Sequence, residues 1–272
     1  MKVSNNQRGF TMIELLVGML AAAILSYAAL SLYTTQHKHM LVQDEIADMQ
    51  GNLRSSAEVL AKSIRKAGYN LPDDLLPIEH SDTNPDTIVV TYDTGILAGI
   101  ELLNDIVDPG DELWCTREDV SGLEEGQWAY IYDPTAETGE FFVATRVLTG
   151  PARIQHSTMP FSHFYPAGSK ILKLARIKYF VDSSDSTGTN LLIQTYGSQP
   201  EIFAENIANL NFRYFLASGA VVTAPANPAD IRLVEIDIEG RTESPDPALF
   251  NQYRTRNFTL RVNVRNLGLS QL

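Results

Sequence analysis

An uninterrupted apolar segment near the N-terminus constrains this chain more than any other feature. From Leu15 to Gln36 there are 22 consecutive uncharged residues, and Glu14 is the only charged residue between positions 10 and 33. About 20 apolar residues in a helix are enough to cross the hydrocarbon core of a bilayer. Lys2 and Arg8 precede the segment without an acidic residue between them. The positive-inside rule therefore predicts a cytoplasmic N-terminus and an extracytoplasmic remainder of the chain.

Three explanations of this segment differ in how they treat Glu14. A cleaved signal peptide has an apolar core of about 7–15 residues with small residues at its end, whereas this run is longer and its alanines 21–23 lie in the middle. A plain transmembrane anchor explains the length but not the carboxylate. A charge inside an apolar helix costs roughly 2.5–3.5 kcal/mol and indicates a functional residue with a partner. The third explanation is a processed membrane helix that uses Glu14.

The residues around Glu14 favour the third explanation. The run Arg8-Gly9-Phe10-Thr11-Met12-Ile13-Glu14 resembles the processing site of the type IV pilin superfamily. The resemblance implies that a prepilin peptidase cuts between Gly9 and Phe10 on the cytoplasmic side and methylates the new Phe10 amine. It also implies that Glu14 pairs with the Phe10 amine of a neighbouring subunit in a filament. An unpaired buried charge is costly, so this pairing would set the register of assembly.

The apolar segment is predicted to be the first half of one long helix. Proline is absent before Pro72, and Gly68 is the expected C-cap. These signals predict a helix from about residue 11 to 67, roughly 85 Å long. Its second half carries apolar residues at helical spacing, which we expect to pack on a sheet. This stripe consists of Val42, Ile46, Met49, Leu53, Ala57, Leu60 and Ile64.

The rest of the chain shows patterns typical of strands, and no helical segments alternate with them. The predicted fold class is therefore α+β, with the long helix packed on an antiparallel β domain as in pilins. We divide the chain into a leader (1–9), a transmembrane half-helix (10–34), an extracytoplasmic half-helix (35–68) and a β-rich globular domain (69–272). The strand candidates are 87–92, 112–116, 128–132, 141–148, 171–181, 190–196, 209–215, 231–239 and 257–265.

Charge is concentrated in one stretch of the domain. The chain has a net charge of −12, and residues 71–130 alone contribute −14, so we expect one acidic face or set of loops and no direct nucleic-acid binding. The densest acidic loop is a weak calcium candidate, because its spacing is not that of a DxDxDG loop and a solvated turn is the favoured explanation. The calcium candidates are Asp105, Asp108, Asp111 and Glu112.

No pattern in the sequence indicates catalysis. There is one cysteine, Cys115, so an intrachain disulfide is excluded, and HExxH, P-loop, GxSxG and CxxC motifs do not occur. We therefore expect no catalytic residues and no cofactor other than the weak calcium site. A membrane-anchored extracytoplasmic enzyme remains an alternative.

Three further segments resemble PilW-type minor pilins: Arg65-Lys66-Ala67-Gly68-Tyr69, 207–215 and Val264-Arg265-Asn266-Leu267. The resemblance implies a minor pilin at or near the tip of a type IV pilus, where it promotes pilus assembly. The implied partners are the prepilin peptidase, other minor and major pilins and the inner-membrane assembly platform. The implied location is the inner membrane, as a single-pass protein, and then the periplasm or the cell-surface pilus. A J-type minor pseudopilin of type II secretion is the alternative within the same class.

Overall fold

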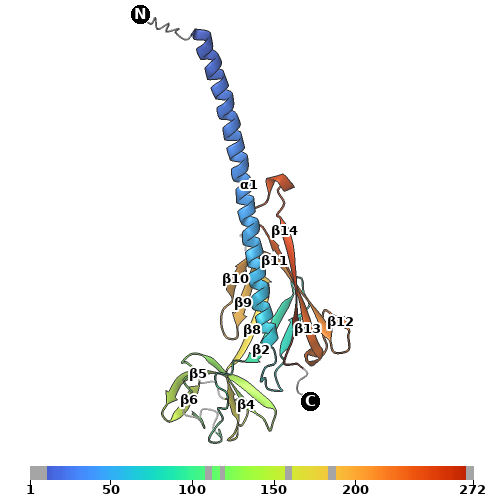
Figure 1. Ribbon diagram of the computed structural model, residues 1–272. Helices are drawn as coiled ribbons and strands as arrows, with labels where there is room; N and C mark the ends of the chain where they lie inside the picture. Colours follow the sequence, from blue (N-terminus) through green and yellow to red (C-terminus); the bar gives the residue numbers. More distant parts are fainter. Residues whose placement is uncertain (1–10, 108–111, 117–119, 157–160, 183–187, 268–272) are drawn as a thin grey trace, which may run out of the picture.

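One long helix and three antiparallel sheets make up most of the part of the chain that the structure describes (Figure 1). The computed structural model describes residues 11–107, 112–116, 120–156, 161–182 and 188–267. The helix α1 (Met12–Lys66) extends away from the rest of the molecule with its N-terminal half, and its C-terminal half packs on the β domain. The predicted α+β architecture, a long N-terminal helix on antiparallel sheets, is confirmed.

The two ends of α1 show why the helix begins and stops where it does. At the N-terminus the Thr11 side chain and the Glu14 side chain form a reciprocal capping box. At the C-terminus the helix ends at Lys66, and the N–H of the cap residue Ala67 donates to the Ile64 carbonyl. Gly68 follows with φ +74°, a left-handed conformation that favours glycine. The sequence placed both ends within one residue.

Two sheets and the C-terminal half of α1 enclose the main core, and we call this part the body. The first body sheet has the strand order β1-β2-β8-β9-β10, and the second has the order β12-β11-β13-β14. The strands of the first are β1 (Ile78–Ser81), β2 (Thr87–Asp93), β8 (Leu174–Asp182), β9 (Asn190–Thr195) and β10 (Glu201–Glu205). Those of the second are β11 (Ile207–Leu216), β12 (Val221–Val222), β13 (Ile231–Arg241) and β14 (Thr255–Asn263).

The alternation along the central strand β13 explains how the second body sheet is oriented. Val234, Ile236 and Ile238 are buried in the core that contains α1. On the opposite face Glu235 lies between two exposed arginines of neighbouring strands, Arg213 and Arg261, and forms an ion pair with each. The sheet therefore has one apolar face toward the helix and one polar face, as expected of a half-buried antiparallel sheet.

The third sheet forms a separate layer beyond the C-terminal end of α1 (Figure 1). This distal sheet has the order β3-β6-β5-β4-β7 and belongs to a segment inserted between β2 and β8. It has its own apolar core, which includes Leu113, Ile131, Ile154 and Ile171. Its strands are β3 (Leu113–Trp114), β4 (Trp128–Asp133), β5 (Thr138–Thr149), β6 (Ala152–His156) and β7 (Lys170–Leu172).

A small aromatic and aliphatic cluster joins the distal sheet to the body. Tyr130, Tyr132 and Leu172 are buried there against Leu75 and Leu174. The Tyr130 hydroxyl also donates to the Asp74 carboxylate at 2.5 Å. The distal sheet is thus fixed to the loop that follows α1, so that its position is tied to the helix.

Two expectations from the sequence need correction. Residues 171–181 were predicted as one strand, but they divide at Lys173 into the end of β7 and most of β8, which belong to different sheets. The acidic stretch 71–130 does not form a single face, because it supplies β1 and β2 to the body and then enters the distal segment, but most of its described acidic residues lie in loops, which is the other alternative. Asp86 and Asp93 within it are buried. Asp86 accepts the N–H groups of Thr83 and Phe212.

Candidate functional site

The N-terminal end of α1 holds Glu14, the one charged residue of the apolar segment. The Glu14 Oε2 atom accepts the backbone N–H and the hydroxyl of Thr11, each at 2.9 Å, and the Thr11 hydroxyl oxygen accepts the Glu14 N–H at 3.3 Å. Glu14 therefore satisfies a donor that the helix itself leaves free. The proposed cleavage residues Gly9 and Phe10 lie outside the described residues.

The N-terminal half of α1 is exposed along its whole length in the described part of the chain. Every residue from 12 to 41 is exposed, including Met12 at 86% and Leu25 at 70%. Among the described residues, α1 is the one helix that is long and apolar enough to span a membrane. A helix that is apolar on all sides needs lipid or other helices around it.

The C-terminal half of α1 has one buried face. Of the predicted stripe, Met49, Leu53, Ala57, Leu60 and Ile64 are buried in the body core. Ile46 is partly buried against the same core, and Val42, one turn closer to the N-terminus, is half-buried. Two polar residues, Ser56 and Ser63, are buried with them. The Ser63 hydroxyl lies 2.5 Å from the Tyr179 hydroxyl of β8, which ties the helix to the first body sheet.

The four calcium candidates do not come together as a described site. Asp108 and Asp111 lie outside the described residues. Asp105 accepts the Ala167 N–H at 2.8 Å. The Glu112 carboxylate accepts hydrogen bonds from the Gln155 side-chain amide at 2.5 Å and from the Arg153 guanidinium at 3.0 Å. These contacts hold the pKa of the Glu112 carboxyl below its ordinary value. No group of three metal-ligating side chains occurs within the described residues.

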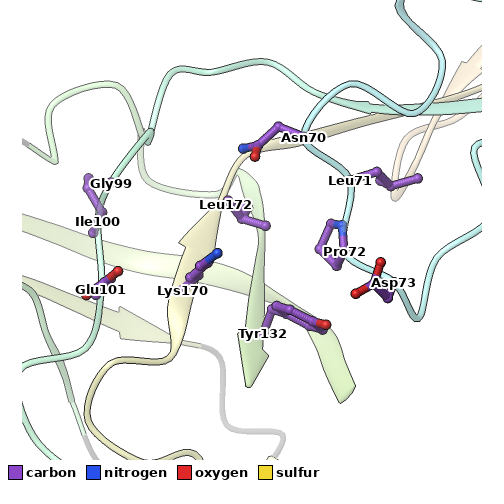
Figure 2. Close-up of a pocket in the computed structure, with 10 residues that line it drawn as sticks. All are labelled: Asn70, Leu71, Pro72, Asp73, Gly99, Ile100, Glu101, Tyr132, Lys170 and Leu172. Carbon is purple, nitrogen blue, oxygen red and sulfur yellow. The ribbon is translucent and has the colours of Figure 1, made fainter. Parts of the chain in front are cut away.

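A polar cavity of about 340 Å³ lies where the distal sheet meets the loop after α1 (Figure 2). Its lining includes one positively charged side chain, Lys170 of β7, and two carboxylates, Glu101 and Asp73. The buried ring of Tyr132 lies on its wall. These lining residues include no nucleophile with an adjacent base, so the cavity offers polar contacts rather than covalent chemistry.

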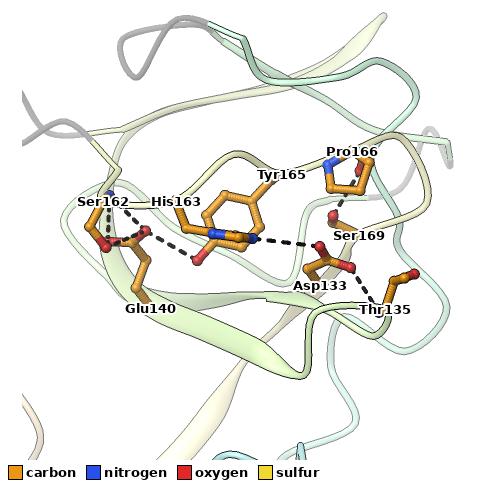
Figure 3. A network of polar contacts seen from close by, with 8 residues as sticks. All are labelled: Asp133, Thr135, Glu140, Ser162, His163, Tyr165, Pro166 and Ser169. Atoms are coloured by element: carbon orange, nitrogen blue, oxygen red, sulfur yellow. Dashed lines mark hydrogen bonds and ion pairs between the residues drawn. The ribbon is translucent and has the colours of Figure 1, made fainter.

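A network of polar side chains on the distal sheet was not predicted from the sequence (Figure 3). Glu140 accepts the Ser162 N–H at 2.9 Å and the Tyr165 hydroxyl at 3.1 Å. His163 Nε2 lies 3.6 Å from the Asp133 carboxylate. Burial, followed by the charge of Glu140, raises the pKa of Tyr165 above its ordinary value.

Serine, histidine and aspartate in this network do not form a catalytic triad. The Ser162 side chain is bonded to Glu140, whereas the His163 ring is directed to Asp133 (Figure 3). A triad needs the serine hydroxyl on the histidine that the aspartate orients. The network instead holds the 162–165 loop against the sheet. The bonded partners come from separate segments, the β4–β5 hairpin and the 162–165 loop, and no spacing signal could have identified them.

Comparison with known proteins identifies the N-terminal segment. A family model described as the prokaryotic N-terminal methylation motif matches residues 4–30, which include Gly9, Phe10 and Glu14. No curated protein and no solved structure matches the chain. The chain therefore carries a prepilin-type N-terminal methylation motif and, in this segment, is similar to type IV pilins and pseudopilins. The motif implies processing by a prepilin peptidase.

Proposed function

We propose that the chain is a minor pilin that is cut between Gly9 and Phe10 and incorporated into a type IV pilus at or near its tip, where it promotes assembly. The observation that carries this proposal is the exposure of the N-terminal half of α1, which does not pack on the β domain. Thirty residues, 12–41, are exposed and mostly apolar, yet they form a regular helix. Lipid covers this surface before assembly, and the helices of neighbouring subunits cover it in the filament.

In this proposal Glu14 guides the transfer of a subunit from the lipid bilayer into the filament. Among the described residues both contacts of its carboxylate with Thr11 end on Oε2, so that Oε1 can accept from a charged amine. In the proposal this amine is the methylated N-terminus of Phe10 on a neighbouring subunit. Because a carboxylate in an apolar helix is costly without a partner, the pairing draws each subunit into register.

The distal sheet supports placement at or near the tip. It is an additional layer beyond the end of α1, opposite to the membrane-spanning half (Figure 1). A subunit inside a filament is surrounded on several sides by copies, whereas a subunit at the tip has a free distal end. The distal sheet adds bulk at that free end and leaves the helix half unobstructed.

Substitution of Glu14 tests the proposal. In Glu14→Ala we expect cleavage at the normal site, because the peptidase acts at Gly9, but at least a tenfold loss of sheared surface pili. Glu58→Ala is the matched control, since Glu58 is an exposed carboxylate on the other half of the same helix. Wild-type pilus levels in Glu14→Ala would contradict the proposal. Secretion is measured in parallel, and a secretion defect with normal pili would identify a pseudopilin instead.

A further inference from the structure

The loop between β13 and β14 exposes apolar side chains, of which the Tyr253 ring also lies against the Arg241 guanidinium at 4.4 Å. It covers residues 242–254 and contains a short 3-10 turn, η2 (Pro247–Leu249). Phe250 is 95% exposed, and Leu249 and Tyr253 are 37% and 41% exposed. Exposed apolar groups that lie together on a loop mark a contact surface more often than an isolated exposed residue does.

This loop is held in one conformation by Asp246. The Asp246 side chain is buried, and its carboxylate accepts the Ala248 N–H at 2.8 Å and Arg254 Nε at 2.6 Å. The Asp246 main chain is bonded to Asn251 and Gln252. The Ala248 N–H and then the Arg254 guanidinium keep the pKa of Asp246 below its ordinary value, so the carboxylate is charged at neutral pH. These contacts hold the loop, and with it the exposed apolar residues, in one conformation.

The backbone directly after η2 is in an unfavourable conformation. Phe250 has φ +55° and Asn251 has φ +58°, both in the left-handed region. Asparagine tolerates this region, whereas an aromatic residue does so at a cost. Packing within the domain does not compensate for this cost, because the Phe250 side chain is almost entirely exposed. Backbone strain of this kind is concentrated at contact and binding sites.

The loop stands beside α1 at the membrane-proximal end of the body (Figure 1). The Ser244 N–H donates to Glu45 of α1 at 3.2 Å, and His39, earlier on the same helix, is near enough to contribute to the lowered pKa of Asp246. His39 comes three residues after Gln36, the last residue of the uncharged run, which corresponds to about 4.5 Å of helix. The headgroup layer extends roughly 5–8 Å from the hydrocarbon core. The part of the loop near His39 therefore lies at the level of the lipid headgroups when α1 spans a bilayer, whereas Ser244, bonded to Glu45, lies about 13.5 Å of helix beyond Gln36.

We propose that residues 247–253 dock on the outer leaflet of the membrane that anchors α1, with Phe250 and Leu249 inserted at the boundary between headgroups and acyl chains. Tyr253 lies at the headgroup level, where amphipathic aromatic rings are favoured. The contact holds the β domain in one orientation on the membrane before the subunit enters a filament. This inference rests on membrane anchoring of α1 and is independent of incorporation into a pilus.

The test places a fluorescent label beside Phe250 in the full-length chain. Ala248→Cys is labelled with a nitrobenzoxadiazole dye and reconstituted in vesicles of phosphatidylethanolamine and phosphatidylglycerol that carry a headgroup-level spin-labelled lipid. Native Cys115 does not compete, because it is buried and burial raises its pKa to about 11. Ala220→Cys, an exposed alanine in the turn between β11 and β12, is the matched control.

We expect the lipid quencher to reduce emission at position 248 at least threefold more than at position 220. Phe250→Ser in the Ala248→Cys chain should remove most of that difference, while flotation with the vesicles stays unchanged because α1 still anchors the chain. Equal quenching at the two positions, or quenching that Phe250→Ser leaves intact, would overturn the proposal. A label that is unquenched in vesicles but shielded in assembled filaments would assign the loop to a neighbouring subunit instead.

Discussion

Leu20 and Leu60 lie on the same helix, yet the first is 63% exposed and the second is fully buried. Both halves of α1 are regular, so helix formation does not distinguish them. The first half is apolar on every side, whereas the second half has one apolar stripe and polar residues elsewhere. The distribution of apolar residues around the helix axis therefore decides whether a half-helix packs on its own domain or needs lipid and neighbouring subunits.

Truncation of one leucine in each half gives the largest contrast. Leu60→Ala opens a cavity in the body core and should lower the free energy of unfolding by about 2–5 kcal/mol. Leu20→Ala should leave it unchanged, because Leu20 makes no contact with the domain. Pulse proteolysis in urea, on the full chain in micelles, measures both. Equal losses in the two variants would mean that the halves are not energetically separate.

Removal of a buried polar contact should give a smaller effect. Ser63→Ala leaves the buried Tyr179 hydroxyl without its partner, which costs about 1–3 kcal/mol. Ser63→Ala combined with Tyr179→Phe should cost less than the two single changes together, because both partners are then absent. Strictly additive losses would show that the contact does not couple α1 to β8. The same urea assay measures all three variants.

The two helix glycines extend the contrast to the backbone. A methyl group added at Gly51 or Gly18 meets no atom within 4 Å. Gly51→Ala should stabilise the domain by about 0.5–1 kcal/mol, because alanine is the better helix former. Gly18→Ala should not change domain stability, since that half of α1 lies outside the folded unit. Stabilisation by Gly18→Ala of the same size would contradict the separation of the halves.

Calcium should have the smallest effect. Asp105 and Glu112 already accept hydrogen bonds from the chain. We therefore expect no measurable change in the melting temperature at millimolar calcium. The thermal transition of the full chain in micelles, with magnesium as the control, measures this. A stabilisation specific to calcium would show that the acidic loop binds the ion.

Local signals predicted more of this fold than long-range contacts could. The ends of α1 follow from a capping residue and a glycine, and the strand 257–265 was evident from its alternation. The break at Lys173 depends instead on residues distant in sequence. Its carbonyl accepts the Thr94 N–H at 3.0 Å, and its Nζ donates to the Gly122 carbonyl at 3.1 Å. No local pattern encodes such contacts, so one apolar run was taken for one strand.

The candidate site shows the same division. The cleavage residues and Glu14 are contiguous in sequence and were identified together. The Thr11–Glu14 capping box is also encoded locally, as a Thr-x-x-Glu pattern. The pairing of Glu140 with Tyr165 and of His163 with Asp133 arises only when β5 and the 162–165 loop come together. Those residues carry no pattern of their own.

The most direct test of pilin-like processing is the mass of the N-terminal peptide of the chain purified from membranes that contain a prepilin peptidase. We predict that the mature chain begins at Phe10 and carries one N-methyl group. Gly9→Val should retain the leader and serve as the control. A chain that keeps residues 1–9 in the presence of active peptidase, or that is cut at another bond, would contradict the proposal.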